Sequence, residues 1–87
     1  MVFTNPKLMH VRINRGTDVV WEGEAHSLSA TNAVGPFDIL PMHASFLTFV
    51  ENTTITVESA HEENIAVPCM EGIVHVVNNI AQVYVDI

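Results

Sequence analysis

Apolar and polar residues alternate one by one along much of this 87-residue chain. Met9, Val11 and Ile13 alternate with polar residues within positions 7–15, and the same period returns in positions 54–58. This is the period of a β-strand that has one buried and one solvated face. No stretch of a dozen residues shows the apolar spacing of three and four that is typical of an amphipathic helix. The pattern therefore predicts an all-β protein.

Turn-forming residues divide the chain into short pieces at intervals of roughly ten residues. They stand at Arg15-Gly16, 32–36, Glu51-Asn52, 61–64 and Asn78-Asn79. Asparagine and glycine suit such positions because they tolerate positive φ. Eight to ten short, mostly antiparallel strands in one domain of residues 1–87 are expected, arranged as a sandwich or barrel. Pro68 interrupts a β-prone run and indicates a sheet edge or a bulge there, whereas positions 73–77 are apolar on both faces and indicate a central strand.

The densest apolar region lies at positions 35–50, where two apolar runs flank a polar bend that contains Pro41 and His43. Proline disfavours helical geometry in the residue before it, so Leu40 is expected to end a strand and Pro41 to begin a turn. Large side chains on both sides of the bend, including three of the four phenylalanines, are expected to form the core of this small domain. The residues expected to be buried include Ile39, Leu47 and Ile73.

The charge balance limits the classes of partner. Three Lys and Arg residues stand against ten Asp and Glu residues, which gives a formal charge of −7. Such a chain repels phosphate backbones and anionic lipid headgroups, so we expect no nucleic-acid partner and membrane association only through another protein. Cys69 is the single cysteine, so an internal disulfide is excluded. The start lacks a basic segment followed by an apolar run, and the sequence predicts a soluble cytoplasmic protein.

The residue types of common catalytic and metal sites are present without their usual spacing. The five histidines include no His-x-His pair and no pair four residues apart, and Cys69 has no Cys-x-x-Cys partner, so we expect no metal. Asp38 and His43 flank the same bend, but no serine nucleophile motif accompanies them. The four glycines are scattered and form no phosphate-binding loop. We therefore expect no cofactor and no catalytic residue, and a β module whose role is binding.

Five segments carry a resemblance to a known family. They are Trp21-Glu22-Gly23, Gly35-Pro36-Phe37-Asp38-Ile39-Leu40-Pro41-Met42-His43-Ala44, Phe46-Leu47-Thr48, Gly72-Ile73-Val74-His75-Val76 and Val83-Tyr84-Val85-Asp86. Together they resemble the epsilon subunit of F-type ATP synthases, called delta in mitochondria, and the resemblance runs from Leu8 to Ile87. Three positions depart from the family's glycine, proline and glycine, namely Met42, Ser45 and Glu71. Pro36 stands where many members carry a glutamate.

The resemblance implies a small, flattened β-sandwich in the central stalk of a rotary ATP synthase. It implies a non-catalytic rotor subunit without cofactor or metal, whose partners are the gamma subunit and the ring of c subunits. Such a subunit couples ion-driven rotation to ATP synthesis and is peripheral on the inner face of the cell membrane. The sequence stops where the family's sandwich stops, so the helical hairpin that binds ATP and inhibits rotation is expected to be missing.

The resemblance also implies two contact surfaces. The residues expected at the c-ring end of the sandwich are Val34, Gly35, Pro36, Met42, His43 and Ser45. Glu22 and Glu24 are the expected partners of basic residues on the gamma subunit. For His43, a turn histidine that bonds a backbone carbonyl is an equally good interpretation. The alternative function is a free-standing β-sandwich that binds a peptide or a carbohydrate, for which Trp21 and Tyr84 are the aromatic candidates.

Overall fold

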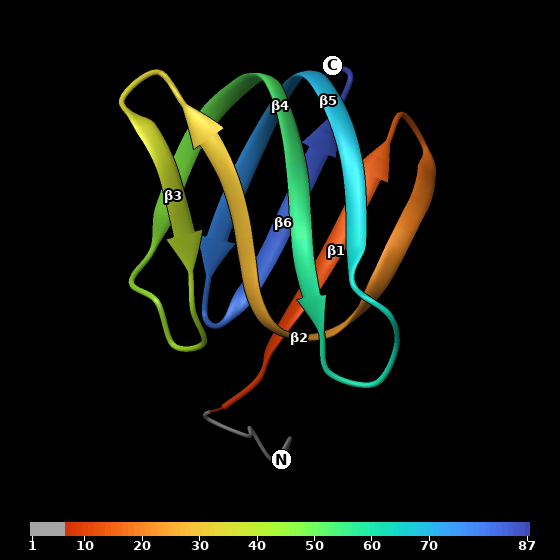
Figure 1. The fold of residues 1–87 in the computed structure, drawn as a ribbon, viewed down its shortest axis with the longest axis vertical. Coiled ribbons are helices and arrows are strands. Elements are labelled where there is room, and N and C mark those ends of the chain that lie inside the picture. Colours follow the sequence, from red (N-terminus) through yellow and green to blue (C-terminus); the bar gives the residue numbers. More distant parts are fainter. Residues whose placement is uncertain (1–6) are drawn as a thin grey trace.

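The computed structural model describes residues 7–87, which form six β-strands and no helix (Figure 1). The strands are β1 (Met9–Arg15), β2 (Asp18–Asn32), β3 (Gly35–Ile39), β4 (Phe46–Ser59), β5 (Ile65–Val77) and β6 (Ile80–Val85). The prediction of an all-β fold is confirmed. Within this part of the chain, no helix is long and apolar enough to cross a membrane.

Three long strands run through both layers of the sandwich (Figure 1). β2, β4 and β5 have 15, 14 and 13 residues. β4 contains Asn52 with a φ of 48°, and the pairing of β2 with β4 shifts register between Ala25 and Ser27. From sequence alone each half of such a strand looks like a separate short strand, so eight to ten strands are predicted where the structure has six. The turn predicted at Glu51-Asn52 is wrong, because these residues lie inside β4.

The strand pairings define the two layers. The β6 layer has the order β4, β5, β6, β1, β2 and uses positions 46–51 of β4, 71–77 of β5 and 18–25 of β2. The β3 layer has the order β3, β2, β4, β5 and uses the remaining halves of the long strands. β1 and β6 pair in parallel, and the other neighbouring strands are antiparallel. β5 is flanked by β4 and β6 along positions 72–76, which confirms that this piece is central.

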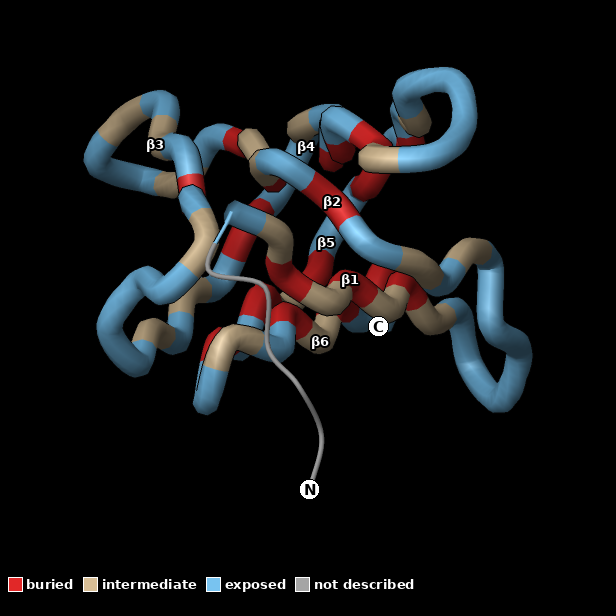
Figure 2. Tube along the Cα trace, turned by 90° about the horizontal axis from the view of Figure 1, so that it is seen from below, coloured by how far each residue is buried: buried red, intermediate tan, exposed pale blue. Residues whose placement is uncertain are grey.

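The core lies between the two layers, and Figure 2 shows buried positions alternating with more exposed ones along the strands, while the loops are mostly exposed. Its largest fully buried side chains are Met9, Ile13, Leu28, Ile39, Ile55 and the valines at positions 11, 50, 57, 74, 76, 83 and 85. Trp21, Phe37, Phe46 and Ile65 are partly buried and pack against this cluster. The expected burial of Ile39 is therefore confirmed.

The expected burial of Leu47 is wrong, and Ile73 is only half-buried. Leu47 is 68% exposed and Phe49 is 49% exposed, whereas Val50 is 1% exposed. Neighbouring side chains of a strand point to opposite faces. Because Val50 enters the core, Leu47 and Phe49 must point outward. Ile73 pairs with Phe49 on β4 and shares its outward side.

The predicted turns agree with the backbone at the ends of the strands. β3 ends at Ile39, and a turn at Pro41 and Met42 follows. Asn78 and Asn79 have φ values of 52° and 65° and form the two-residue connection between β5 and β6. Pro68 lies in the half of β5 that pairs only with β4, so the predicted edge position is confirmed.

Candidate functional site

In-register residues form three rows on the outer face of the β6 layer. The first row is Leu47, His75, Gln82, Arg12 and Glu22. The second is Phe49, Ile73, Tyr84, Asn14 and Val19. The third is Val77, Ile80, His10 and Glu24. Apolar side chains dominate at the β4, β5 and β6 end of these rows, and charged side chains lie at the β1 and β2 end.

We call the apolar end the apolar face, and it consists of Leu47, Phe49, Ile73, Val77, Ile80 and Tyr84. Five of these side chains are exposed, from Val77 at 37% to Leu47 at 68%. His75 lies among them and is also exposed. Contiguous exposed apolar surface is uncommon on a soluble protein and marks sites of interaction. The apolar face is therefore the first candidate for a docking surface.

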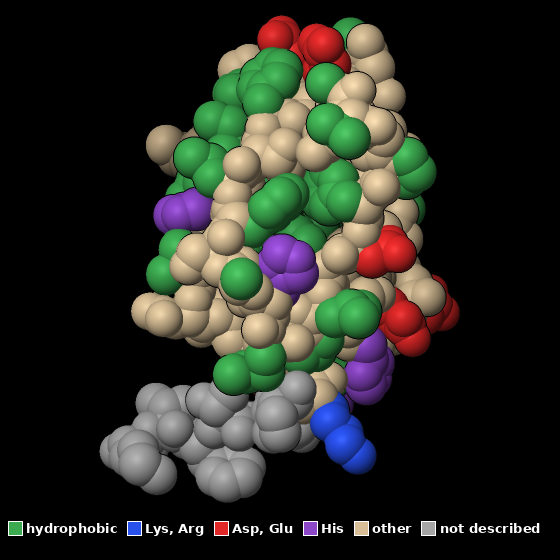
Figure 3. Space-filling model, turned by 90° about the vertical axis from the view of Figure 1, so that its left-hand side faces the viewer, with side chains coloured by type: hydrophobic (Ala, Val, Ile, Leu, Met, Phe, Trp, Pro, Cys, Tyr) green, Lys and Arg blue, Asp and Glu red, His purple; other side chains and the backbone are tan. Residues whose placement is uncertain are grey.

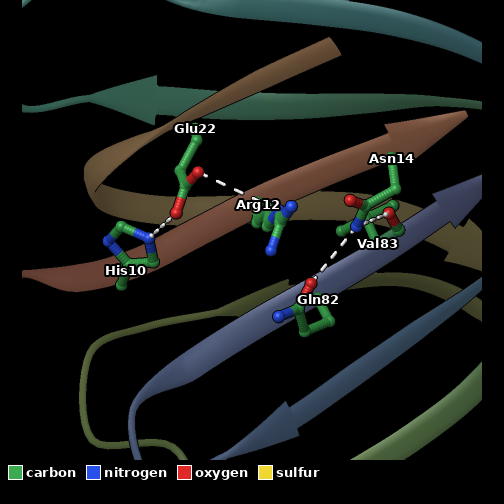
Figure 4. Close-up of polar contacts among 6 residues, drawn as sticks. All are labelled: His10, Arg12, Asn14, Glu22, Gln82 and Val83. Atoms are coloured by element: carbon green, nitrogen blue, oxygen red, sulfur yellow. Dashed lines mark hydrogen bonds and ion pairs between the residues drawn. The ribbon is translucent and has the colours of Figure 1, made fainter. Parts of the chain in front are cut away.

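The charged end is held together by polar contacts within the chain (Figure 4). Nε2 of His10 lies 2.6 Å from a carboxylate oxygen of Glu22, and Nε of Arg12 lies 3.9 Å from the other oxygen. The hydrogen bond from His10 is the main reason that the pKa of Glu22 lies below its usual range. Glu24 has a histidine partner as well, since Nε2 of His61 lies 2.9 Å from its carboxylate.

The sequence gives no sign of these two pairings, because each partner is distant along the chain. Glu22 and Glu24 are the residues expected to face basic residues of the gamma subunit, and in the structure each also has a histidine partner in its own chain. Their position at the margin of the apolar face leaves them available as a charged rim.

The residues expected at one end of the sandwich lie at two ends. Val34, Gly35 and Pro36 belong to the β2–β3 hairpin, whereas Met42, His43 and Ser45 follow the opposite end of β3 (Figure 1). β3 has five residues, and at about 3.3 Å per residue the two groups are roughly 15 Å apart. The expectation that all six residues lie at one end of the sandwich is therefore wrong, because the extended strand β3 separates the two groups.

The tip of the β2–β3 hairpin is stiffened by Asn32. Its side-chain oxygen accepts hydrogen bonds from the backbone N–H groups of Val34 at 2.9 Å and Gly35 at 3.2 Å. Its amide nitrogen donates to Oγ1 of Thr48 at 3.1 Å, which ties the tip to β4. The Val34 side chain is 97% exposed. The chain thus presents an apolar side chain on a fixed tip.

The bend after β3 is tied to the β5–β6 turn. The N–H of Met42 donates to the side-chain oxygen of Asn79 at 2.8 Å, and the amide nitrogen of Asn79 donates to the carbonyl of Leu8. Met42 has a φ of 66° and is 60% exposed. Nδ1 of His43 lies 2.7 Å from the carbonyl oxygen of Ala44, the kind of partner expected for a turn histidine. The bend and the turn line an open cavity of about 450 Å³.

The outer face of the β3 layer is mainly polar, and its apolar members Pro36, Ala66 and Pro68 lie on the two edge strands. It carries Ser27, Ser29, Thr31, Asp38, Thr54, Thr56 and Glu58. Oγ of Ser29 donates to Asp38 at 2.6 Å, so this carboxylate has a partner other than His43. Over residues 7–87, no group of three or more His, Cys, Asp and Glu side chains is placed to hold a metal ion. Trp21 is partly buried and packs against the core.

The contiguous exposed apolar face makes this small β-sandwich a candidate docking domain. Residues 8–87 match the family described as the ATP synthase delta/epsilon chain, β-sandwich domain, and the chain belongs to this family. The predicted identity and the β-sandwich are both confirmed by this match. No curated protein sequence is similar enough to count as a relative.

Two solved structures share the fold. A chain of the mitochondrial ATP synthase of Euglena gracilis superposes with a TM-score of 0.83 at 12% identity, over 95% of this chain and 53% of that chain. A chain of the central stalk and c-ring of the Tetrahymena thermophila mitochondrial ATP synthase gives a TM-score of 0.74 at 14% identity, over 94% and 66%. The chain thus spans about half and two thirds of the lengths of these two chains.

Proposed function

We propose that this domain is a non-catalytic part of the central stalk of an F-type ATP synthase. It binds the gamma subunit through the apolar face and the c ring through the β2–β3 hairpin, and so couples ion-driven rotation to ATP synthesis. The observation that carries the proposal is the contiguous exposure of the apolar face on a domain of the delta/epsilon family. A closely packed sandwich suits this role because interiors packed at crystal-like density transmit strain.

The apolar face is assigned to the gamma subunit because its apolar area lies beside a charged margin. Interfaces commonly combine an apolar centre with a polar rim. Glu22 and Glu24 lie in that rim, next to His10 and Arg12. Basic residues of gamma would face these two carboxylates. The polar face of the β3 layer has serine and threonine side chains at its centre and would stay in water.

The hairpin is assigned to the c ring because Val34 is the most exposed large apolar side chain of residues 7–87 and its backbone is fixed. The two ends of β3 lie on opposite sides of the domain, so a flat ring surface can contact only one of them. Met42, His43 and Ser45 are then proposed to contact a second part of the rotor. The domain reaches the membrane only through the complex. The domain would then lie at the inner face of a cell membrane, as the resemblance implies, or at a mitochondrial membrane, as in the two matched enzymes.

The test of the gamma contact compares two glutamate substitutions on opposite faces. Phe49→Glu puts a carboxylate into the apolar face, where burying it without a partner costs several kcal/mol, so co-purification with the gamma subunit should fall more than about 100-fold. Thr56→Glu, on the polar face, is the matched control and should bind normally. Thermal melting of both free chains checks that they are folded. Equal binding by the two variants would show that the gamma subunit contacts another part of the domain.

The two ends of β3 are distinguished by ATP synthesis in reconstituted vesicles. Val34→Glu should uncouple rotation from synthesis if the hairpin meets the c ring. The double variant Met42→Glu, Ser45→Glu should do so only if the bend is part of the same coupling contact. Full coupling by the Val34→Glu enzyme would overturn the assignment of the hairpin.

A further inference from the structure

The free strand edges of this sandwich are not equally protected. An unpaired edge exposes N–H and C=O groups that can pair with another strand, and proteins block such edges with proline or charge. Both edges of the β3 layer contain a proline, Pro36 in β3 and Pro68 in β5. In the β6 layer, the free edge of β2 at positions 18–24 carries three acidic residues.

The free edge of β4 has no such block. Positions 46–51 of β4 pair with β5 on one side, and no strand of residues 7–87 pairs on the other side. The segment Phe-Leu-Thr-Phe-Val-Glu contains no proline, lysine or arginine, and its one charge stands at the end. It is therefore the least protected edge of the domain.

The side chains along this edge continue the apolar face. Leu47 and Phe49 point outward and are exposed, whereas Val50 points into the core. An open cavity of about 440 Å³ lies between the edge and the β2–β3 hairpin, lined by Asn32, Ala33, Val34, Thr48, Phe49 and Glu51. Figure 3 views the molecule from the left of Figure 1 and shows apolar side chains along this side, with acidic side chains at the upper end. A strand added here would have apolar surface to cover and room beside the hairpin.

The acidic end of the edge indicates the charge of the occupant. Glu51 on β4 and Glu71 on β5 stand directly opposite each other. Like charges at paired positions are unfavourable, and neither carboxylate is in an ion pair with any side chain of residues 7–87. A lysine or arginine from a partner would relieve this repulsion.

We propose that the free edge of β4, from Phe46 to Glu51, accepts an extended segment of a partner protein by β-strand addition. The segment carries apolar side chains at alternate positions, which extend the apolar face, and a lysine or arginine that lies beside Glu51 and Glu71. Backbone pairing supplies affinity, and the alternate side chains supply specificity. This contact goes beyond the docking of gamma and of the c ring because it adds main-chain pairing at a strand edge, although it shares Leu47 and Phe49 with the apolar face.

The test uses the 87-residue chain and a synthetic peptide, an acetylated octapeptide of alternating valine and threonine with a lysine at each end. Binding is followed by NMR chemical shifts and by hydrogen exchange of the backbone amides. We expect saturable shifts at positions 46–51 and exchange at this edge slowed at least about tenfold. The same peptide with glutamate at both ends should bind much more weakly.

Matched variants separate backbone pairing from charge. Leu47→Lys places a cation on the edge and should abolish binding of the lysine peptide, whereas Thr56→Lys, at an exposed position of the polar face, should not. The double variant Glu51→Gln, Glu71→Gln should weaken binding roughly threefold to tenfold, and Glu58→Gln should leave it unchanged. These changes lie at exposed positions, and melting curves check the fold.

Three outcomes would overturn the proposal. One is that shifts appear only on the polar face, and another is that the peptide binds the Leu47→Lys variant as well as the parent. The third is that the peptide-free chain shows concentration-dependent shifts at positions 46–51, which would make a second copy the occupant. Loss of gamma binding by Phe49→Glu with normal peptide pairing by the parent would leave this proposal standing, so the two proposals fail separately.

Discussion

The substitution Gly72→Ala tests how tightly β5 is held between its neighbours. Gly72 pairs with Val50 on β4 and with Val85 on β6. A Cβ added at this position would lie 2.6 Å from the carbonyl oxygen of Tyr84 and 2.7 Å from Sγ of Cys69. Contacts of a Cβ below 3.0 Å are essentially never observed. The carbonyl belongs to β6, which is paired on both sides, so it cannot withdraw without disturbing the sheet.

The expected loss follows from two opposing terms. Overpacking of this kind costs about 1–3 kcal/mol, and the stiffer unfolded chain returns about 0.4–1 kcal/mol. The midpoints of the two ranges give a net loss of about 1.3 kcal/mol, which lowers the melting temperature of a domain of this size by about 5–10 °C. Urea and thermal unfolding can be followed by the fluorescence of Trp21, the single tryptophan, which packs against the core.

The control variant is Gly72→Ala in a Cys69→Ala background. Removing Sγ relieves one of the two contacts and leaves the contact with the Tyr84 carbonyl, so most of the loss should remain. If Gly72→Ala melted within about 2 °C of the parent, the strands would be able to separate freely, and the argument from fixed neighbours would be refuted.

Ile55→Ala should lower the free energy of unfolding by about 2–5 kcal/mol because Ile55 is fully buried. Leu47→Ala, at an exposed position, should change it by less than about 0.5 kcal/mol, and urea unfolding measures both. Met42 has a left-handed backbone, so Met42→Gly should leave the melting temperature unchanged or raise it by the equivalent of up to about 1 kcal/mol; a clear decrease would contradict this. The pKa of Glu22 lies below 4.5 because His10 donates to it, so the stabilising effect of this carboxylate is present above pH 4.5 and is lost as the pH falls through the lowered pKa. In a carboxyl-carbon NMR titration, His10→Ala should raise this pKa toward 4.5, and an unchanged value would refute the assigned cause.

Residue alternation was enough to predict the fold class and most turns, because both depend on local chemistry. Gly16, Asn78 and Asn79 have the positive φ values that their turn positions predict. Asn52 has the same backbone signature inside a continuous strand. A bend that carries a strand from one layer to the other therefore looks like a turn between two strands, and only the pairing with β5 distinguishes them.

The inward and outward faces of β4 could not be chosen from the sequence. Positions 46–50 carry large apolar residues on both faces, so Leu47 and Phe49 are as good candidates for the core as Val50. The choice is made by register, which places Val50 opposite Gly72 inside the sandwich. The rows of the outer face and the His10–Glu22 contact depend on that register too, because they join residues from up to five strands.

The parallel pairing of β1 with β6 has a consequence for the order in which the domain is made. β1 is the first described strand to leave the ribosome, and one of its edges stays without a partner until positions 80–85 have emerged. Until then the nascent sheet presents unpaired edges on both β1 and β5, the kind of surface that aggregates or recruits chaperones. Closure of this layer joins residues about 70 positions apart, as His10 and Ile80 show, so it is expected to be slow and to come late in synthesis. A chain interrupted before Ile80 would keep most of its sequence and still be unable to close the sheet.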